Sequence, residues 1–190
     1  GHILLKSMEI RIGGQKIDKQ YGEWMHIWNE LSQSTGKASG YAEMVGNVPQ
    51  LTQIHSSNTR SAENSGTDCT IGAYTLYIPL QFWFCRNPGM ALPLIALQYH
   101  DVVLNLDFRT FDECIWATTQ TVSGSTNTFV SSTGVNSIGS KSLTSTNIYV
   151  DYIYLDTEER RRFSSVAHEY LIEQLQFTGE ENINASSNSI

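Results

Sequence analysis

Charged residues are scarce in this sequence, and basic residues are the scarcest. Asp, Glu, Lys and Arg together make up 16% of the 190 residues, and the formal net charge is −7. A general nucleic-acid-binding protein usually presents a basic face, so we predict no direct nucleic-acid binding. The one basic cluster, Arg160 to Arg162, directly follows Glu158 and Glu159. Such a run is most often solvated and partly paired, although a phosphate group or an acidic partner would also fit it.

Cysteine is rare as well, and its spacing argues against two kinds of stabilising framework. Cys69, Cys85 and Cys114 are odd in number and include no Cys-x-x-Cys pair. This pattern disfavours both a disulfide scaffold and a structural zinc site. The cysteines are therefore expected to be free thiols in a reducing compartment.

Long apolar runs are missing too. The longest, such as Met90 to Leu97, are far too short to span a bilayer, and no signal peptide is visible. We therefore expect no transmembrane segment. Gly1 to Ile3 contain no initiator Met and lead directly into a strand pattern, so the chain is expected to be an internal piece of a longer protein.

Aromatic and branched residues are concentrated instead between Leu76 and Arg109. Asn87-Pro88-Gly89 divides this region into two apolar segments without helical period, which predicts two β-strands joined by a turn. The second segment passes into alternation, with one apolar and one wet face. The apolar face would hold Val102, Leu104, Leu106 and Phe108, and the wet face Asp101, Asn105, Asp107 and Arg109.

The N-terminal part predicts a strand, a turn and short helices. Residues 8–12 alternate apolar and polar side chains, and Gly13-Gly14 signals a hairpin or a bulge. A helical turn over residues 41–45 is expected to end at Gly46. Between the Gly13-Gly14 signal and this turn, a short amphipathic helix is predicted, because four apolar residues have the spacing of one helix face: Trp24, Ile27, Trp28 and Leu31.

The C-terminal part predicts a strand at residues 149–155. Asp156 and Glu159 then resemble a capping box that begins a helical turn ending near Phe163. The apolar residues within 166–177 fit either one face of a helix or the alternation of a strand, so the pattern alone does not decide between helix and strand.

Two polar stretches have no apolar period and are expected to be surface loops with little regular structure. They are Thr52 to Gly72 and Thr118 to Asn147, and the second has room for a short strand near Phe129. The core is expected instead where apolar residues share a face: Trp24, Trp28, Phe82, Phe84, Leu104 and Leu106.

Three histidines and one cysteine are candidates for carrying chemistry. A Cys85–His100 pair would need a geometry that sequence does not reveal, and His100 at the start of an alternating strand is expected to be structural. His26 has Glu23 three residues before it and Glu30 four residues after it, which predicts surface pairing. His168 and the adjacent Glu169 could supply two metal ligands, but the sequence has no second cluster of ligands to complete a site.

The remaining candidates are weaker. Asp107 and Asp112 would have to face each other to act as a glycosidase pair. Trp116 borders the Ser/Thr-rich stretch and would suit sugar stacking. The only glycosylation sequon is Asn184-Ala185-Ser186. We therefore predict no catalytic residue, no metal site and no cofactor.

Three long segments, in order along the chain, resemble the major capsid proteins of large nucleocytoplasmic DNA viruses, the double jelly-roll family. Leu5 to Leu31 has the family's strand, Gly-Gly turn and Trp-rich helix. The second segment is IPLQFWFCRNPGMALPLIALQYHDV, and the third is YVDYIYLDTEERRRFSSVAHEYLIEQLQ. The third resembles the end of the family's first jelly roll, which favours a strand for residues 166–177.

The resemblance implies an all-β, antiparallel jelly-roll sandwich with short helices in its connections. Residues 1–178 would be the later part of the first jelly roll, without its opening strands, and 179–190 would start a linker toward a second. A fragment of this kind exposes sheet edges and is expected to aggregate alone.

The implied function is structural. The subunit would form a homotrimer, tile an icosahedral shell in the virion and contact minor capsid proteins, after assembly in the host cytoplasm. It would have no enzymatic activity. Arg160 to Arg162 could form salt bridges between subunits during assembly. The alternatives are a carbohydrate-binding jelly-roll module using Trp116 and a metal-dependent jelly-roll enzyme.

Overall fold

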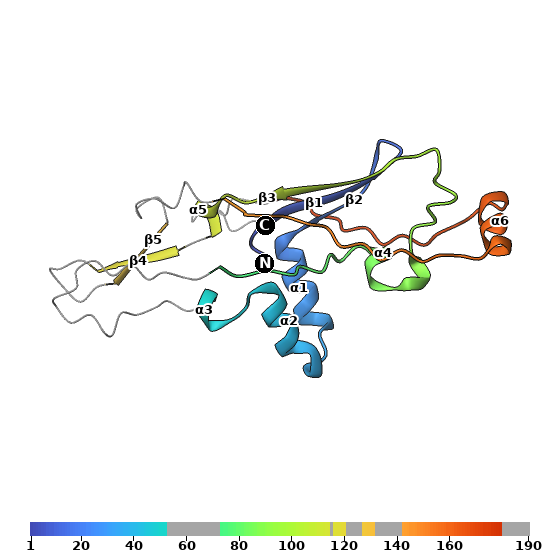
Figure 1. Cartoon of the computed structure of the whole chain (residues 1–190). Coiled ribbons are helices and arrows are strands. Elements are labelled where there is room, and N and C mark those ends of the chain that lie inside the picture. Colours follow the sequence, from blue (N-terminus) through green and yellow to red (C-terminus); the bar gives the residue numbers. More distant parts are fainter. Residues whose placement is uncertain (53–72, 115, 121–126, 132–141, 180–190) are drawn as a thin grey trace, which may run out of the picture.

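The computed structural model describes residues 1–52, 73–114, 116–120, 127–131 and 142–179. Figure 1 shows an elongated arrangement, with helices below a small sheet and long extended segments running beside it. The strands are β1 Leu5–Ile12, β2 Gln15–Tyr21, β3 Val102–Phe108, β4 Trp116–Gln120 and β5 Asn127–Ser131. The α-helices are α1 Gly22–Ser32, α2 Ala38–Val45, α3 Pro49–Thr52, α4 Trp83–Arg86, α5 Phe111–Cys114 and α6 Thr157–Ser165, and the 3-10 turns are η1 Thr35–Lys37 and η2 Pro88–Met90.

The main sheet is antiparallel, with strand order β2-β1-β3. The hairpin between β1 and β2 turns at Gly13 and Gly14, whose φ angles are 58° and 82°. A two-residue hairpin with positive φ at both central positions matches the twist of the strands, and glycine adopts it without steric cost. The predicted hairpin and the predicted strand at Val102 are both confirmed.

A register shift in β1 explains its burial pattern. Leu5 pairs with Phe108, but Ser7 pairs with Asp107, so Lys6 is an extra residue in the ladder. Such a bulge reverses the side-chain parity. Leu5, at an odd position, and Met8, at an even one, are therefore both buried.

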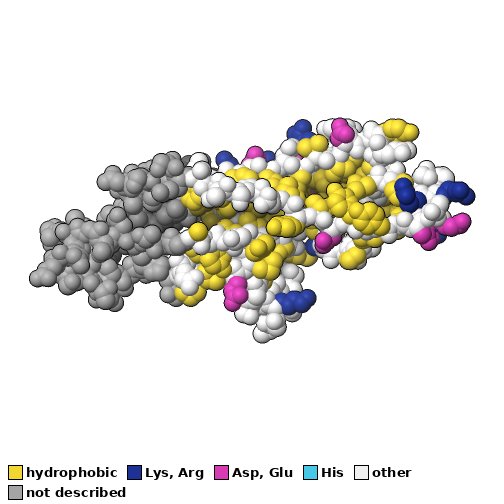
Figure 2. Space-filling view, in the orientation of Figure 1, with side chains coloured by type: hydrophobic (Ala, Val, Ile, Leu, Met, Phe, Trp, Pro, Cys, Tyr) yellow, Lys and Arg dark blue, Asp and Glu magenta, His cyan; other side chains and the backbone are white. Residues whose placement is uncertain are grey.

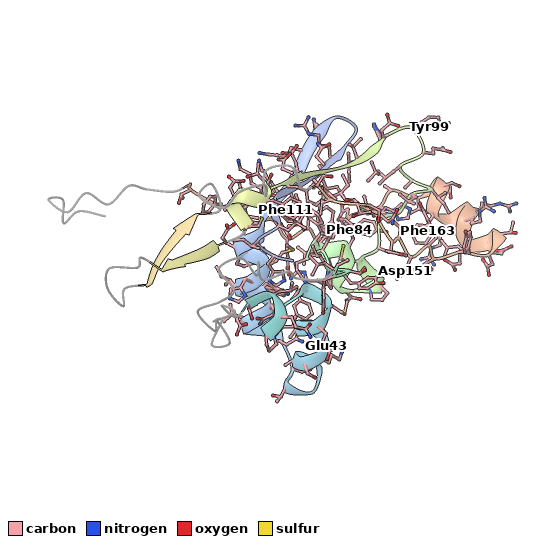
Figure 3. The ribbon with its side chains drawn as sticks, turned by 60° about the vertical axis from the view of Figure 1, so that its left-hand side comes forward. Glu43, Phe84, Tyr99, Phe111, Asp151 and Phe163 are labelled. Carbon is pink, nitrogen blue, oxygen red and sulfur yellow. The ribbon has the colours of Figure 1, made fainter. Side chains whose placement is uncertain are left out.

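The core lies where the sheet meets α1 and α4. Its buried apolar residues are Leu5, Met8, Ile10, Met25, Phe82 and Trp83. Hydrophobic side chains gather along the middle of the face shown in Figure 2, and Figure 3 places Phe84 near the middle of the molecule, while Tyr99, 87% exposed, lies at the periphery. Of the expected core, Phe82 is confirmed, whereas the other five residues are only half-buried.

The expected apolar face of α1 was wrong. Met25 is fully buried, while Ile27 and Leu31 are 49% and 78% exposed. Gly22 packs against the backbone of residues 2–5, and this close approach turns the Gly22–Met25 side inward. Trp24 and Trp28 then flank the core, with their rings 5.9 Å apart.

Three further strand predictions were wrong, because these segments are in neither of the described sheets. The first, expected within residues 76–86, is extended as far as residue 81 but lies along α2, where the Tyr77 amide donates to the Met44 carbonyl at 2.8 Å, and its second half is the helical turn α4. Residues 149–155 and 166–177 form no ladder with any described segment. Apolar alternation favours extension, but a strand exists only where a second backbone pairs with it.

Local signals for caps were reliable. Helix α2 ends at Gly46 with φ 78°, and the Asp156 side chain accepts the Glu159 amide at 2.9 Å at the start of α6. Residues 118–147 are not simply a loop, because β4 and β5 pair there, and β5 contains the strand expected near Phe129. The expected loop over 52–72 lies almost wholly outside the described residues.

The predicted fold class is thus confirmed in its coarse form, a small antiparallel sheet with short helices in the connections. The described strands do not close a jelly-roll sandwich by themselves. None of the described helices combines the length and the apolar character that crossing a bilayer requires.

Candidate functional site

The catalytic candidates whose side chains the structure describes do not converge. No hydrogen bond joins Cys85 to His100 in the described part of the chain, and His100 is exposed. Although Cys85 as a residue is exposed, partial burial of its sulfur raises the pKa of the thiol above its ordinary value. A cysteine nucleophile needs the opposite shift.

Two further histidines have local explanations. His168 lies within hydrogen-bond distance of the Phe163 carbonyl, 2.7 Å, and its ring stacks on Phe163 with centroids 4.9 Å apart. The expected surface pairing of His26 is wrong: within the described residues it forms an ion pair with neither Glu23 nor Glu30, and Glu23 pairs with Arg109 instead. Among the residues described, no three His, Cys, Asp or Glu side chains are grouped as metal ligands would be.

Other candidates lie partly outside the described structure. Asp107 accepts a hydrogen bond from Ser7 Oγ at 2.7 Å, which gives it a structural role. The side chains of Asp112 and Trp116, and the sequon at 184–186, are not described.

One polar cluster joins the N-terminus to two helices. The His2 Nε2 atom is 2.9 Å from the Tyr41 hydroxyl, and the His2 and His26 ring centroids are 6.0 Å apart. The Gly1 amino group donates to the Val45 carbonyl. Burial, followed by the Gly1 amino charge and His26, lowers the pKa of His2 to about 4.

This shift predicts acid sensitivity of the folded protein, to be measured on the full-length form, because burial is the main cause of the lowered pKa of His2. His2 in the unfolded chain takes up its proton near pH 6.5, whereas the folded chain resists it until about 4. Stability should therefore fall as the pH drops from 6.5 to 4, by on the order of 1 kcal/mol because solvent screens a half-exposed ring. The measurement is the urea midpoint across this range.

The matched variant is His2→Gln, which keeps a polar group toward Tyr41 but does not titrate. Subtracting its pH profile removes the contribution of the carboxylates. Identical profiles for both proteins would show that His2 has no part in the acid sensitivity.

The most unusual surface is an extended segment that is apolar on both sides. Tyr149 and Tyr154 are 82% and 91% exposed. The large apolar side chains exposed along it are Ile148, Tyr149, Val150, Tyr152, Ile153 and Tyr154. Contiguous exposed apolar surface of this kind marks a region that another chain segment covers, and its position beside the sheet is visible in Figure 1.

Helix α6 follows this segment at one end of the molecule (Figure 1). Its acidic residues, Glu158 and Glu159, lie in the first turn, and Arg162 lies in the last. This arrangement complements the helix dipole. None of the three arginines of the cluster forms an ion pair within the described residues, so they are available to a partner.

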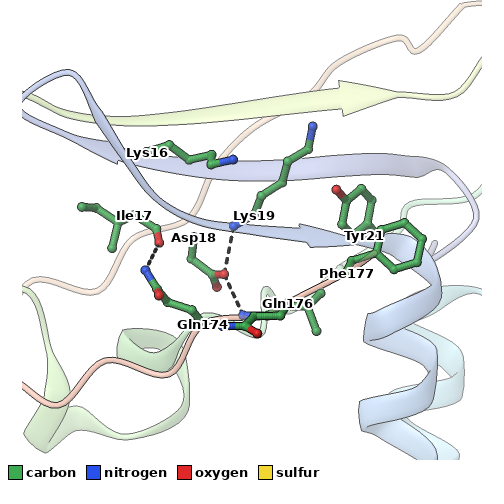
Figure 4. A pocket seen from close by; sticks show the side chains of 9 residues that line it. Lys16, Ile17, Asp18, Lys19, Tyr21, Gln174, Gln176 and Phe177 are labelled. Carbon is green, nitrogen blue, oxygen red and sulfur yellow. Dashed lines mark hydrogen bonds between the residues drawn. The ribbon is translucent and has the colours of Figure 1, made fainter. Parts of the chain in front are cut away.

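Two hollows are open at the surface. One lies between β2 and residues 174–177 (Figure 4), and the other between residues 93–97 and the end of α6. Sequence reasoning missed Asp18, which faces the first hollow and is 2% exposed. No sequence signal pointed to it, because its inward-facing position becomes visible only once β2 is paired with β1.

Comparison with known proteins places these features in a family. A family model described as "Major capsid protein N-terminus" matches residues 1–156. The major capsid protein of Phaeocystis pouchetii virus is 48% identical over 100% of this chain and 37% of its own length. That of Paramecium bursaria Chlorella virus 1 is 37% identical over 97% of this chain and 35% of its own length.

Comparison with solved structures gives the same family as comparison of sequences. A quasi-atomic model of the PBCV-1 virus capsid superposes with a TM-score of 0.60 and 32% identity, covering 98% of this chain and 38% of that one. The chain thus spans little more than a third of the length of these relatives. The carbohydrate-binding alternative gains no support from them. On the match over residues 1–156, the chain belongs to the major capsid protein family.

Proposed function

We propose that the protein containing this chain is a structural subunit of a virus capsid and has no enzymatic activity. The observation that carries the proposal is the family match over residues 1–156, together with the structural likeness to the PBCV-1 capsid. In this proposal the subunit resides in the virion, assembles in the host cytoplasm and contacts copies of itself and minor capsid proteins.

We further propose that residues 1–178 belong to the first of two jelly rolls and that residues 179–190 begin the linker to the second. The exposed apolar segment at residues 148–154 supports this division. Its extended backbone is ready for ladder pairing, and strands from outside this chain would cover both its faces. Left uncovered, such a segment is an aggregation site.

Assembly into trimers and then a shell follows from the same physics. A closed ring of three subunits buries the same two surfaces in every copy and leaves an outer rim for lattice contacts. Apolar burial contributes about 25 cal/mol per Å² before ordering costs. Because many subunits join one lattice, individually weak contacts are sufficient.

The test is the association state of the full-length protein. We expect a trimer in sedimentation analysis that persists in about 1 M salt, where the Debye length is only about 3 Å and charge-held complexes dissociate. Electron microscopy at higher concentration should show a lattice. A stable monomer that turns over a substrate would contradict the proposal.

A matched pair of variants tests the covered segment. Ile153→Asp places a charge in the apolar segment and should reduce the yield of folded full-length protein severalfold. Glu158→Gln, in the exposed first turn of α6, should leave the yield unchanged. Equal yields from both variants would show that residues 148–154 remain exposed in the full-length protein.

A further inference from the structure

A buried carboxylate without a cation lies in β2. Asp18 is 2% exposed, and no Lys or Arg forms an ion pair with it among the described residues. Burial of a carboxylate is strongly unfavourable unless hydrogen bonds replace water. Three N–H donors do so here: the Lys19 amide at 2.9 Å, Gln20 Nε2 at 3.0 Å and the Leu175 amide at 3.0 Å.

The third donor distinguishes Asp18 from an ordinary satisfied residue. Leu175 is 157 residues away in the sequence, whereas Lys19 and Gln20 lie one and two residues from Asp18. The contact therefore joins the first hairpin to the last described part of the chain. Figure 4 shows the carboxylate between β2 and residues 174–177, with dashed lines to both sides.

Residues 173–177, here called the strap, lie along β2 without forming a β-ladder with it. Side chains make the attachment instead. The Gln174 side-chain amide donates to the Ile17 carbonyl, and the Phe177 ring lies 4.8 Å from the Tyr21 ring. With Asp18, these contacts fix the strap at successive positions of β2.

A separate anchor holds the beginning of the strap. Glu173 forms an ion pair with Arg86 of α4, and the Arg86 guanidinium lies 4.5 Å from the centroid of the Trp28 ring. Arg86 thus connects the strap to α4 and α1. The cation–π contact and the ion pair orient the same guanidinium, which favours one position of Glu173.

We propose that Asp18 sets the register of the strap against β2 and is thus the residue that positions the strap on the sheet. A slip of one residue along an extended segment would turn its side chains to the opposite face. In the native register the buried carboxylate accepts the Leu175 amide, and a slip of one residue would move that donor away. This proposal does not depend on the capsid function.

The experiment is hydrogen exchange measured by mass spectrometry on the full-length protein and its Asp18→Ala variant. Amides in a peptide covering 173–178 should exchange at least about tenfold faster in the variant, because a hydrogen bond to a charged acceptor is lost. Peptides from β1 and β3 should keep their rates. Asp18→Asn retains one acceptor oxygen and should restore most of the protection.

Asp101→Ala is the control, since it removes an exposed carboxylate close to the same sheet. Unchanged exchange at 173–178 in Asp18→Ala would overturn the proposal. An equal increase in β1, β3 and the strap would also overturn it, since Asp18 would then stabilise the whole fold and not the strap. If Asp18→Ala does not fold, Gln174→Ala decides: accelerated exchange confined to the strap supports the proposal, and unchanged exchange refutes it.

Discussion

Gly22→Ala is expected to destabilise strongly the part of the full-length protein that contains β1 and α1. A β-carbon at this position would lie 2.2 Å from the His2 carbonyl oxygen and 2.4 Å from that of Leu5. Both are backbone atoms, and Leu5 is held in β1 by its pairing with Phe108, so neither can move aside cheaply. Overpacking against backbone should cost about 3 kcal/mol or more, a large part of the stability of a domain.

The measurement is the denaturant midpoint of the full-length protein, and Gly40→Ala is the matched control. Gly40 lies in α2, and a β-carbon there would meet nothing within 4 Å. The same substitution should stabilise that helix by about 0.5–1 kcal/mol, because alanine loses less backbone entropy than glycine. A Gly22→Ala protein as stable as the wild type would show that the start of α1 is not packed on residues 2–5.

Phe82→Ala should destabilise the fold by about 3–5 kcal/mol, the range for removing a large buried aromatic residue. Phe82 is completely buried beside Met8, Ile10 and Met25. Its ring stacks on Phe84 at a centroid distance of 5.5 Å. The cavity would adjoin both the sheet and α1, which limits how far the surroundings can collapse into it.

Tyr99→Ala is the control for this prediction, because Tyr99 is 87% exposed and its loss should change the thermal midpoint little. Trp28→Ala should fall between the two, since Trp28 is half-buried and covers Arg86. Equal midpoints for the Phe82 and Tyr99 variants would place the core elsewhere.

The sequence by itself determined the features that depend on a few neighbouring residues. Gly13-Gly14 predicted the hairpin turn, Gly46 the end of α2 and Asp156 the start of α6, because each acts through the local backbone. The alternation around Leu104 predicted β3 in the same way. Family membership was also readable, since long segments of distinctive sequence carry it.

Tertiary structure decided what depends on partners far away in the chain. Which side of α1 is buried follows from the contact of Gly22 with residues 2–5, so Met25 is buried in place of Ile27. Residues 149–155 have strand composition but form no ladder with any described segment, because ladder hydrogen bonds need a second backbone. Asp18 could not be recognised from sequence as the residue that positions the strap, since the amide that it binds belongs to Leu175, 157 positions further on.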